Sequence, residues 1–210
     1  MGLFVSVSAV IGVAQADVTR ALSTFVGTRH GVFQAEPRSP DDDDTMVIAS
    51  ASGNTTVFFP GNDLSWWETS QALSKMLKAP VFAFHIHDSD LWMYELYKNG
   101  EKIDGFNPVP DYWMEISDQE RHAYRGNAQV VASCVPGVDA AEISKYFVTW
   151  DLNADAPARA YPTDEHAYGD EWQLLDFMKK LKLPYPLDAA GKPAGETYEF
   201  IIPSPPKPVK

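Results

Sequence analysis

The first part of the chain combines a strand-like and a helix-like hydrophobic pattern. Residues 3–11 are rich in Val, Phe and Ile, which predicts a buried strand. Helical spacing follows, with Asp17 as the expected cap and Gly27 and Gly31 as the expected end. The apolar stripe of this helix consists of Val18, Ala21, Leu22, Phe25 and Val26.

A second segment with helical periodicity lies within residues 61–80. Asn62 or Asp63 is its expected cap, and Pro80 is expected to end it. Its apolar stripe is predicted to consist of Leu64, Trp67, Leu73, Met76 and Leu77. Between the two helices, residues 31–37 predict a short strand, and residues 46–60 predict one or two strands around a Ser-Gly-Asn turn.

With the hairpin of residues 82–106 included, the order of elements is β-α-β-β-α-β-β. This order predicts an α+β fold in which two helices pack on one face of a largely antiparallel sheet. A ferredoxin-like or related arrangement fits the pattern.

Beyond this region the pattern becomes helical. Ser117 with Glu120 forms a capping box, and a further helix is expected to begin near Asp170. We therefore predict an α+β sheet domain over residues 1–116 and a helical layer over residues 117–187, packed together as one compact unit. Residues 188–210 are predicted to form an extended, Pro-rich tail.

The hairpin region allows a prediction of register. Asn99-Gly100 favours a type I′ turn, which would place Glu95 directly opposite Asp104. A three-residue loop at 88–90 would pair His85 with Met93. One face then carries the apolar side chains Phe82, Phe84, Ile86, Trp92, Tyr94, Leu96 and Ile103, and the helices are expected to pack there.

The opposite face carries His85, His87, Glu95 and Asp104, for which two interpretations stay open. Like charges opposite one another are destabilising, so a cation could offset the pairing of Glu95 with Asp104. Two imidazoles at alternate positions point the same way, and with neighbouring carboxylates they suit zinc or non-haem iron. The alternative is an ordinary polar outer face whose charges are screened by solvent.

The segment "FNPVPDYW" is the second candidate site. It is an extended stretch made rigid by proline and ending in aromatic residues, which is typical of a binding surface. The candidate surface residues are Phe106, Asn107, Pro108, Pro110, Tyr112 and Trp113. The alternative is a loop that pins the sheet to the helical layer.

Composition narrows the classes of function. The formal net charge of −12 disfavours nucleic-acid binding and favours a basic partner. Cys134 is the only cysteine, so neither an intrachain disulfide nor a multi-cysteine zinc site can form. No Lys or Arg precedes the apolar N-terminal run, and no stretch is long enough to span a bilayer. We expect a cytoplasmic protein without a membrane association.

The chain carries none of the common nucleophile-elbow, phosphate-loop or dinucleotide-binding motifs, so binding is favoured over catalysis. The stretches "HIHDSDLWMYELYKNGEKIDGFNPVPDYW" and "YGDEWQLLDFMKKLKLPYP" resemble segments of uncharacterised acidic bacterial proteins. The resemblance extends to immunity-protein-like α+β domains that neutralise toxins, and it implies a binding protein rather than an enzyme.

Three hypotheses of function follow. The first is a module that binds a basic protein, in an immunity-like role and with no cofactor. The second is a metal-binding protein or metal-dependent enzyme that uses His85, His87, Glu95 and Asp104 with zinc or iron. The third is a small-molecule pocket between the sheet and the helical layer, lined by Trp and Tyr.

Overall fold

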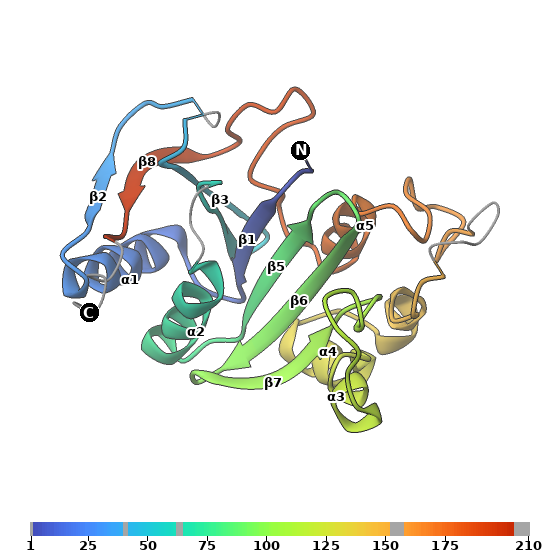
Figure 1. Cartoon of the computed structure of the whole chain (residues 1–210). Helices are drawn as coiled ribbons and strands as arrows, with labels where there is room; N and C mark the ends of the chain where they lie inside the picture. The colour runs from blue at the N-terminus through green and yellow to red at the C-terminus, as the bar shows by residue number, and fades with distance from the viewer. Residues whose placement is uncertain (1, 40–41, 62–64, 152–157, 204–210) are drawn as a thin grey trace.

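The computed structural model describes residues 2–39, 42–61, 65–151 and 158–203 (Figure 1). The strands in this part of the chain are β1 (Val5–Val10), β2 (Val32–Ala35), β3 (Thr45–Ala51), β4 (Asn54–Phe58), β5 (Val81–His87), β6 (Leu91–Lys98), β7 (Glu101–Phe106) and β8 (Glu196–Ile201). The α-helices are α1 (Gln15–Thr28), α2 (Trp66–Leu77), α3 (Asp118–Ala123), α4 (Ala128–Cys134) and α5 (Gln173–Lys180). Short 3-10 turns cover Ala140–Glu142 and Ser144–Tyr146.

The described strands form one eight-stranded sheet in the order β2-β8-β3-β4-β1-β5-β6-β7. Every neighbouring pair is antiparallel. The prediction of an α+β fold with an antiparallel sheet is therefore confirmed. A β-α-β crossover unit makes its two strands parallel, so this sheet is a related arrangement rather than a ferredoxin-like one.

Helices cover both faces of the sheet (Figure 1). On one face, α1 and α2 bury Val18, Leu22 and Leu73 against side chains of the sheet that include Val57 and Val81. The stripe predicted for the first helix is buried in full, although the helix begins at Gln15 and places Asp17 in its first turn. On the other face, residues of the C-terminal half form a second core with side chains of the sheet.

The elements that pack on the two faces of the hairpin differ from those expected. The apolar face with Phe84 and Trp92 packs against the C-terminal layer, chiefly through Phe177 of α5. The first two helices instead cover the opposite face, which carries Ala83 and His85. The prediction that the histidine face is the outside of the sheet is wrong. A three-layer arrangement buries both faces of these central strands.

Helix α2 turns a polar side to the sheet. The predicted stripe is wrong for Trp67 and Met76, which are exposed, while Thr69, Ser70 and Ser74 are buried beside Leu73. The two serine hydroxyls can be buried because they are hydrogen-bonded, whereas no partner is found for the buried Thr69 Oγ1 among the described residues. The Ser70 and Ser8 Oγ atoms lie 2.6 Å apart, and Ser74 Oγ donates to the Ala79 carbonyl. The predicted caps Asn62 and Asp63, and Leu64 of the predicted stripe, lie outside the described residues.

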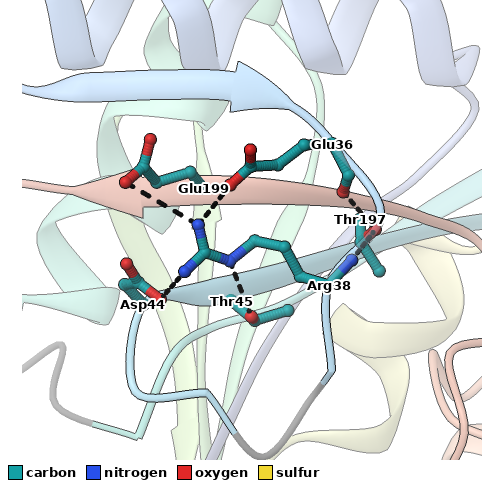
Figure 2. Close-up of polar contacts among 6 residues, drawn as sticks. All are labelled: Glu36, Arg38, Asp44, Thr45, Thr197 and Glu199. Carbon is teal, nitrogen blue, oxygen red and sulfur yellow. Dashed lines mark hydrogen bonds and ion pairs between the residues drawn. The ribbon is translucent and has the colours of Figure 1, made fainter.

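The prediction of an extended tail is wrong for part of residues 188–210. Within residues 188–210, Glu196–Ile201 form β8, which is hydrogen-bonded between β2 and β3. Figure 2 shows how Arg38 fastens this part of the sheet. Its guanidinium donates to Glu36, Asp44 and Thr45, and it lies 3.7 Å from a carboxylate oxygen of Glu199 on β8.

Candidate functional site

His85 is a buried histidine at the end of β5. Its side chain is 8% exposed and stacks on the Trp66 indole at a centroid distance of 4.7 Å. Its Nδ1 lies 3.0 Å from Ser6 Oγ. Burial, and after it the neighbouring His87, lower the pKa of His85 to about 4. His85 is therefore neutral at physiological pH and acts as a packing residue.

His87 lies closer to the surface, inside a group of aromatic rings. Its centroid is 5.0 Å from Phe4, 5.6 Å from Tyr112 and 5.0 Å from Trp113, each in an edge-to-face arrangement. The outer rings are accessible, because Phe4 is 46% and Trp113 is 50% exposed. Leu3 and Met114 extend this exposed group along the chain. We call Leu3, Phe4, His87, Tyr112, Trp113 and Met114 the aromatic surface.

Three segments far apart in sequence build the aromatic surface. The segment before β1 is held to the β5–β6 turn, because the Leu3 N–H donates to Ser89 Oγ at 2.8 Å and the Ser89 N–H donates to the Leu3 carbonyl. The third segment is held to the same turn, because the Tyr112 hydroxyl donates to Asp90. Asp88 and Asp90 thus place carboxylates beside the exposed rings.

The rings continue from the aromatic surface towards α2. His87 Nδ1 lies 3.4 Å from His85 Nε2, His85 stacks on Trp66, and Trp66 meets Trp67 edge-to-face at 5.5 Å. Trp67 is 41% exposed. The surface is therefore anchored through a buried histidine and a buried indole, which restrict the motion of its rings.

The structure does not assemble the predicted metal site. His85 and His87 are adjacent, but the register of β6 with β7 shifts between Leu96 and Tyr97, as at a β-bulge. Glu95 consequently pairs with Gly105, and the predicted pairing of Glu95 with Asp104 is wrong.

The shift sends the two carboxylates to opposite faces of the sheet. Glu95 accepts hydrogen bonds from Lys102 and Tyr97 on the α2 side. Asp104 pairs with Leu96 on the side of the helical layer, where it accepts a hydrogen bond from Tyr94 at 2.7 Å. Burial raises the pKa of Asp104, and its hydrogen bonds oppose this rise.

Across the described residues, no group of three or more His, Cys, Asp or Glu side chains could hold a metal ion. Glu36, Asp44 and Glu199 do converge, but the Arg38 guanidinium occupies the space between them (Figure 2). Asp41, the first of four consecutive aspartates at 41–44, lies outside the described residues. The predicted zinc or iron ligands are therefore not brought together.

The structure divides the predicted binding loop into a buried and an exposed part. Phe106, Asn107 and Pro108 are buried, and the Pro108 carbonyl accepts a hydrogen bond from the Trp150 N–H. These residues pin the sheet to the helical layer, which was the alternative interpretation. Pro110 and Tyr112 are half-buried, whereas Trp113 projects to solvent and joins the aromatic surface.

Phe4 and Trp66 were missed as site residues by sequence reasoning. Phe4 was assigned to a buried strand, although β1 begins only at Val5. Trp67 was predicted in the apolar stripe of the second helix, yet it is exposed, whereas the neighbouring Trp66 stacks on His85. Two adjacent tryptophans on a helix cannot share one buried face, and this was a usable signal for the exposed one.

Comparisons with protein-family models, with curated proteins and with solved structures found no match to this chain. In the part of the chain that the structure describes, no helix has the length and apolar character needed to cross a membrane.

Proposed function

We propose that this protein is a binding module that recognises a basic protein through the aromatic surface. The observation that carries the proposal is the convergence of exposed Phe4 and Trp113 on His87, beside the carboxylates of Asp88 and Asp90. The exposed Met114 follows Trp113 in the chain. Clustered aromatic residues are typical of the energetic centres of protein interfaces.

The chemistry favours a cationic partner. An Arg or Lys side chain can lie over the face of Trp113 while neighbouring carboxylates neutralise its charge. The net charge of −12 would also steer a basic protein towards this chain. The resemblance to immunity-protein-like domains implies the same class of function, with a basic toxin as the partner. We also propose that the protein is cytoplasmic.

Hydrogen bonds within the chain hold the aromatic surface in place before a partner binds. Leu3 is tied to Ser89 by two hydrogen bonds, and Tyr112 is tied to Asp90. Rings that are already held in place lose less conformational freedom when a partner binds. The half-exposed Trp113 is then the residue expected to contribute most to affinity.

The test is capture of partners from a lysate of the source organism at low ionic strength, followed by mass spectrometry. The 210-residue chain is compared with Trp113→Ser and Phe4→Ser. Met76→Ser is the matched control, because Met76 is similarly exposed on α2 but lies outside the aromatic surface. A basic protein should be retained by the native chain and the control, lost with both variants, and released by salt.

Calorimetry with the purified partner then gives the magnitude. A central aromatic residue of an interface contributes at least about 2 kcal/mol, so Trp113→Ser should weaken binding about thirtyfold. Equal retention of the same proteins by all four chains, or a partner that is acidic and insensitive to salt, would refute the proposal.

A further inference from the structure

A separate pocket of about 840 Å³ opens between α5, the segment that follows it and the β3–β4 turn. Its walls are largely apolar and include Trp172, Leu175, Met178, Leu183, Tyr185 and Leu187. The volume lies within the range of about 300–1,000 Å³ that is typical of small-molecule sites. None of the residues that line it belongs to the aromatic surface.

Cationic side chains edge this pocket, in contrast to the acidic character of the whole chain. Lys179 and Lys182 both line it. Lys182 donates to the Gly137 carbonyl at 3.1 Å, which leaves two further donors on its ammonium group. The Lys179 ammonium lies 3.7 Å from Glu165, and both side chains are exposed, so solvent screens this pair.

Asp188, the acidic residue among those that line the pocket, already accepts hydrogen bonds from the backbone. Asp188 Oδ1 accepts hydrogen bonds from the backbone N–H groups of Ala190 and Lys192 at 2.8 and 2.9 Å. This carboxylate stabilises its own turn and competes less for the two lysines. The polar edge is therefore suited to an anion.

Tyr185 adds a neutral donor. Its ring packs edge-to-face against Phe58 and Trp172. Burial raises the pKa of Tyr185 to about 12, so the phenol stays protonated. Among the residues that the structure describes, no hydrogen-bond partner of this hydroxyl is found.

We propose that this pocket binds an amphipathic carboxylate with an aliphatic body, of the fatty-acid class. The aliphatic chain lies against Leu175, Met178 and Leu187, and the carboxylate lies at Lys179 and Lys182. Leucine and methionine side chains adapt to a flexible alkyl chain, and methionine is the most adaptable of the apolar side chains. The proposal is independent of the protein-binding role, because the two sites share no residue.

The experiment is isothermal titration of the 210-residue chain with laurate, below its critical micelle concentration, and with lauryl alcohol as the neutral analogue. Laurate should bind with one site and more tightly than the alcohol. The double variant Lys179→Met with Lys182→Met should weaken laurate binding at least about fivefold and leave the alcohol unaffected. Lys98→Met, an exposed lysine away from the pocket, is the matched control and should bind as the native chain does.

Two further variants locate the site. Ala51 is an exposed residue of the pocket edge, so Ala51→Trp should fill part of the pocket and abolish laurate binding without unfolding the chain. Trp113→Ser should leave laurate binding unchanged. The proposal is overturned if laurate does not bind or binds no better than the alcohol. It is equally overturned if the double lysine variant binds as the native chain does, or if Trp113→Ser is the variant that abolishes binding.

Discussion

Replacing His85 by glutamine tests whether the buried imidazole makes the stability of this protein dependent on pH. The side chain is enclosed by Trp66, Ser6 and His87, and its pKa is lowered from about 6.5 to about 4, first by burial and then by the charge of His87. Between these two values the unfolded chain binds a proton that the folded chain does not bind. Stability therefore rises with pH through this window and is lost as pH falls through it.

The magnitude follows from the size of the shift. A lowering of about 2.5 pH units at about 1.36 kcal/mol per unit corresponds to about 3 kcal/mol. This contribution is fully present above about pH 6.5 and is gone below about pH 4. Domains of this kind are stable by about 5–15 kcal/mol, so the effect is a substantial fraction of the total.

Urea unfolding between about pH 4 and about pH 7.5 measures the effect. Glutamine can keep a hydrogen bond to Ser6 but does not titrate, so His85→Gln should lose about 3 kcal/mol less than the native chain on acidification. His122→Gln replaces an exposed histidine of α3 and should follow the native pH dependence. Parallel curves for the native chain and His85→Gln would refute the reasoning, whatever the constant offset between them.

Two further substitutions test polar contacts of the sheet. Arg38→Met leaves Glu36, Asp44 and Glu199 as neighbouring carboxylates without their cation. Its thermal unfolding at about pH 7 should therefore occur at a lower temperature than that of the control Arg20→Met, which removes an exposed ion pair with Asp17. The deficit should shrink at about pH 3, where the carboxylates are protonated, and a deficit that stays constant with pH contradicts the electrostatic explanation. Tyr94→Phe removes a buried hydrogen bond to Asp104 and should reduce the free energy of unfolding by about 1.5–3 kcal/mol, measured in urea. Tyr112→Phe, which loses a surface hydrogen bond to Asp90, should have a smaller effect, and equal losses would argue against the role of burial.

Local sequence patterns predicted the hairpins well. The three-residue loop at 88–90 pairs His85 with Met93, as expected, and the Asn99-Gly100 turn pairs Tyr97 with Lys102. Both depend on a few adjacent residues whose backbone conformation is set locally, including positive φ angles at Asp88, Ser89 and Asn99. The alternation of side chains held along β5 and β6 for the same reason. In β7 it is interrupted between Lys102 and Asp104, and Ile103 of the predicted apolar face is exposed.

The prediction of a metal site was wrong because it depended on a strand register that local turn signals do not determine. One register shift between Leu96 and Tyr97 moved Asp104 to the opposite face from Glu95. A bulge inserts a residue without changing the hydrophobic alternation on either side of it, so the pattern of the sequence did not reveal it. Strand β8 was missed because its partners, β2 and β3, lie far away along the chain.

The sequence by itself determined the class of fold, the alternating faces of the central strands and the buried stripe of α1, because hydrophobic period is a property of neighbouring residues. Only the tertiary structure decided what covers each face. It placed α2 over His85 and the C-terminal layer over Phe84. It also brought Phe4, His87 and Trp113 into one surface. Contacts of this kind join segments that carry no local signal of one another, and they form because each apolar face must find another to be buried against.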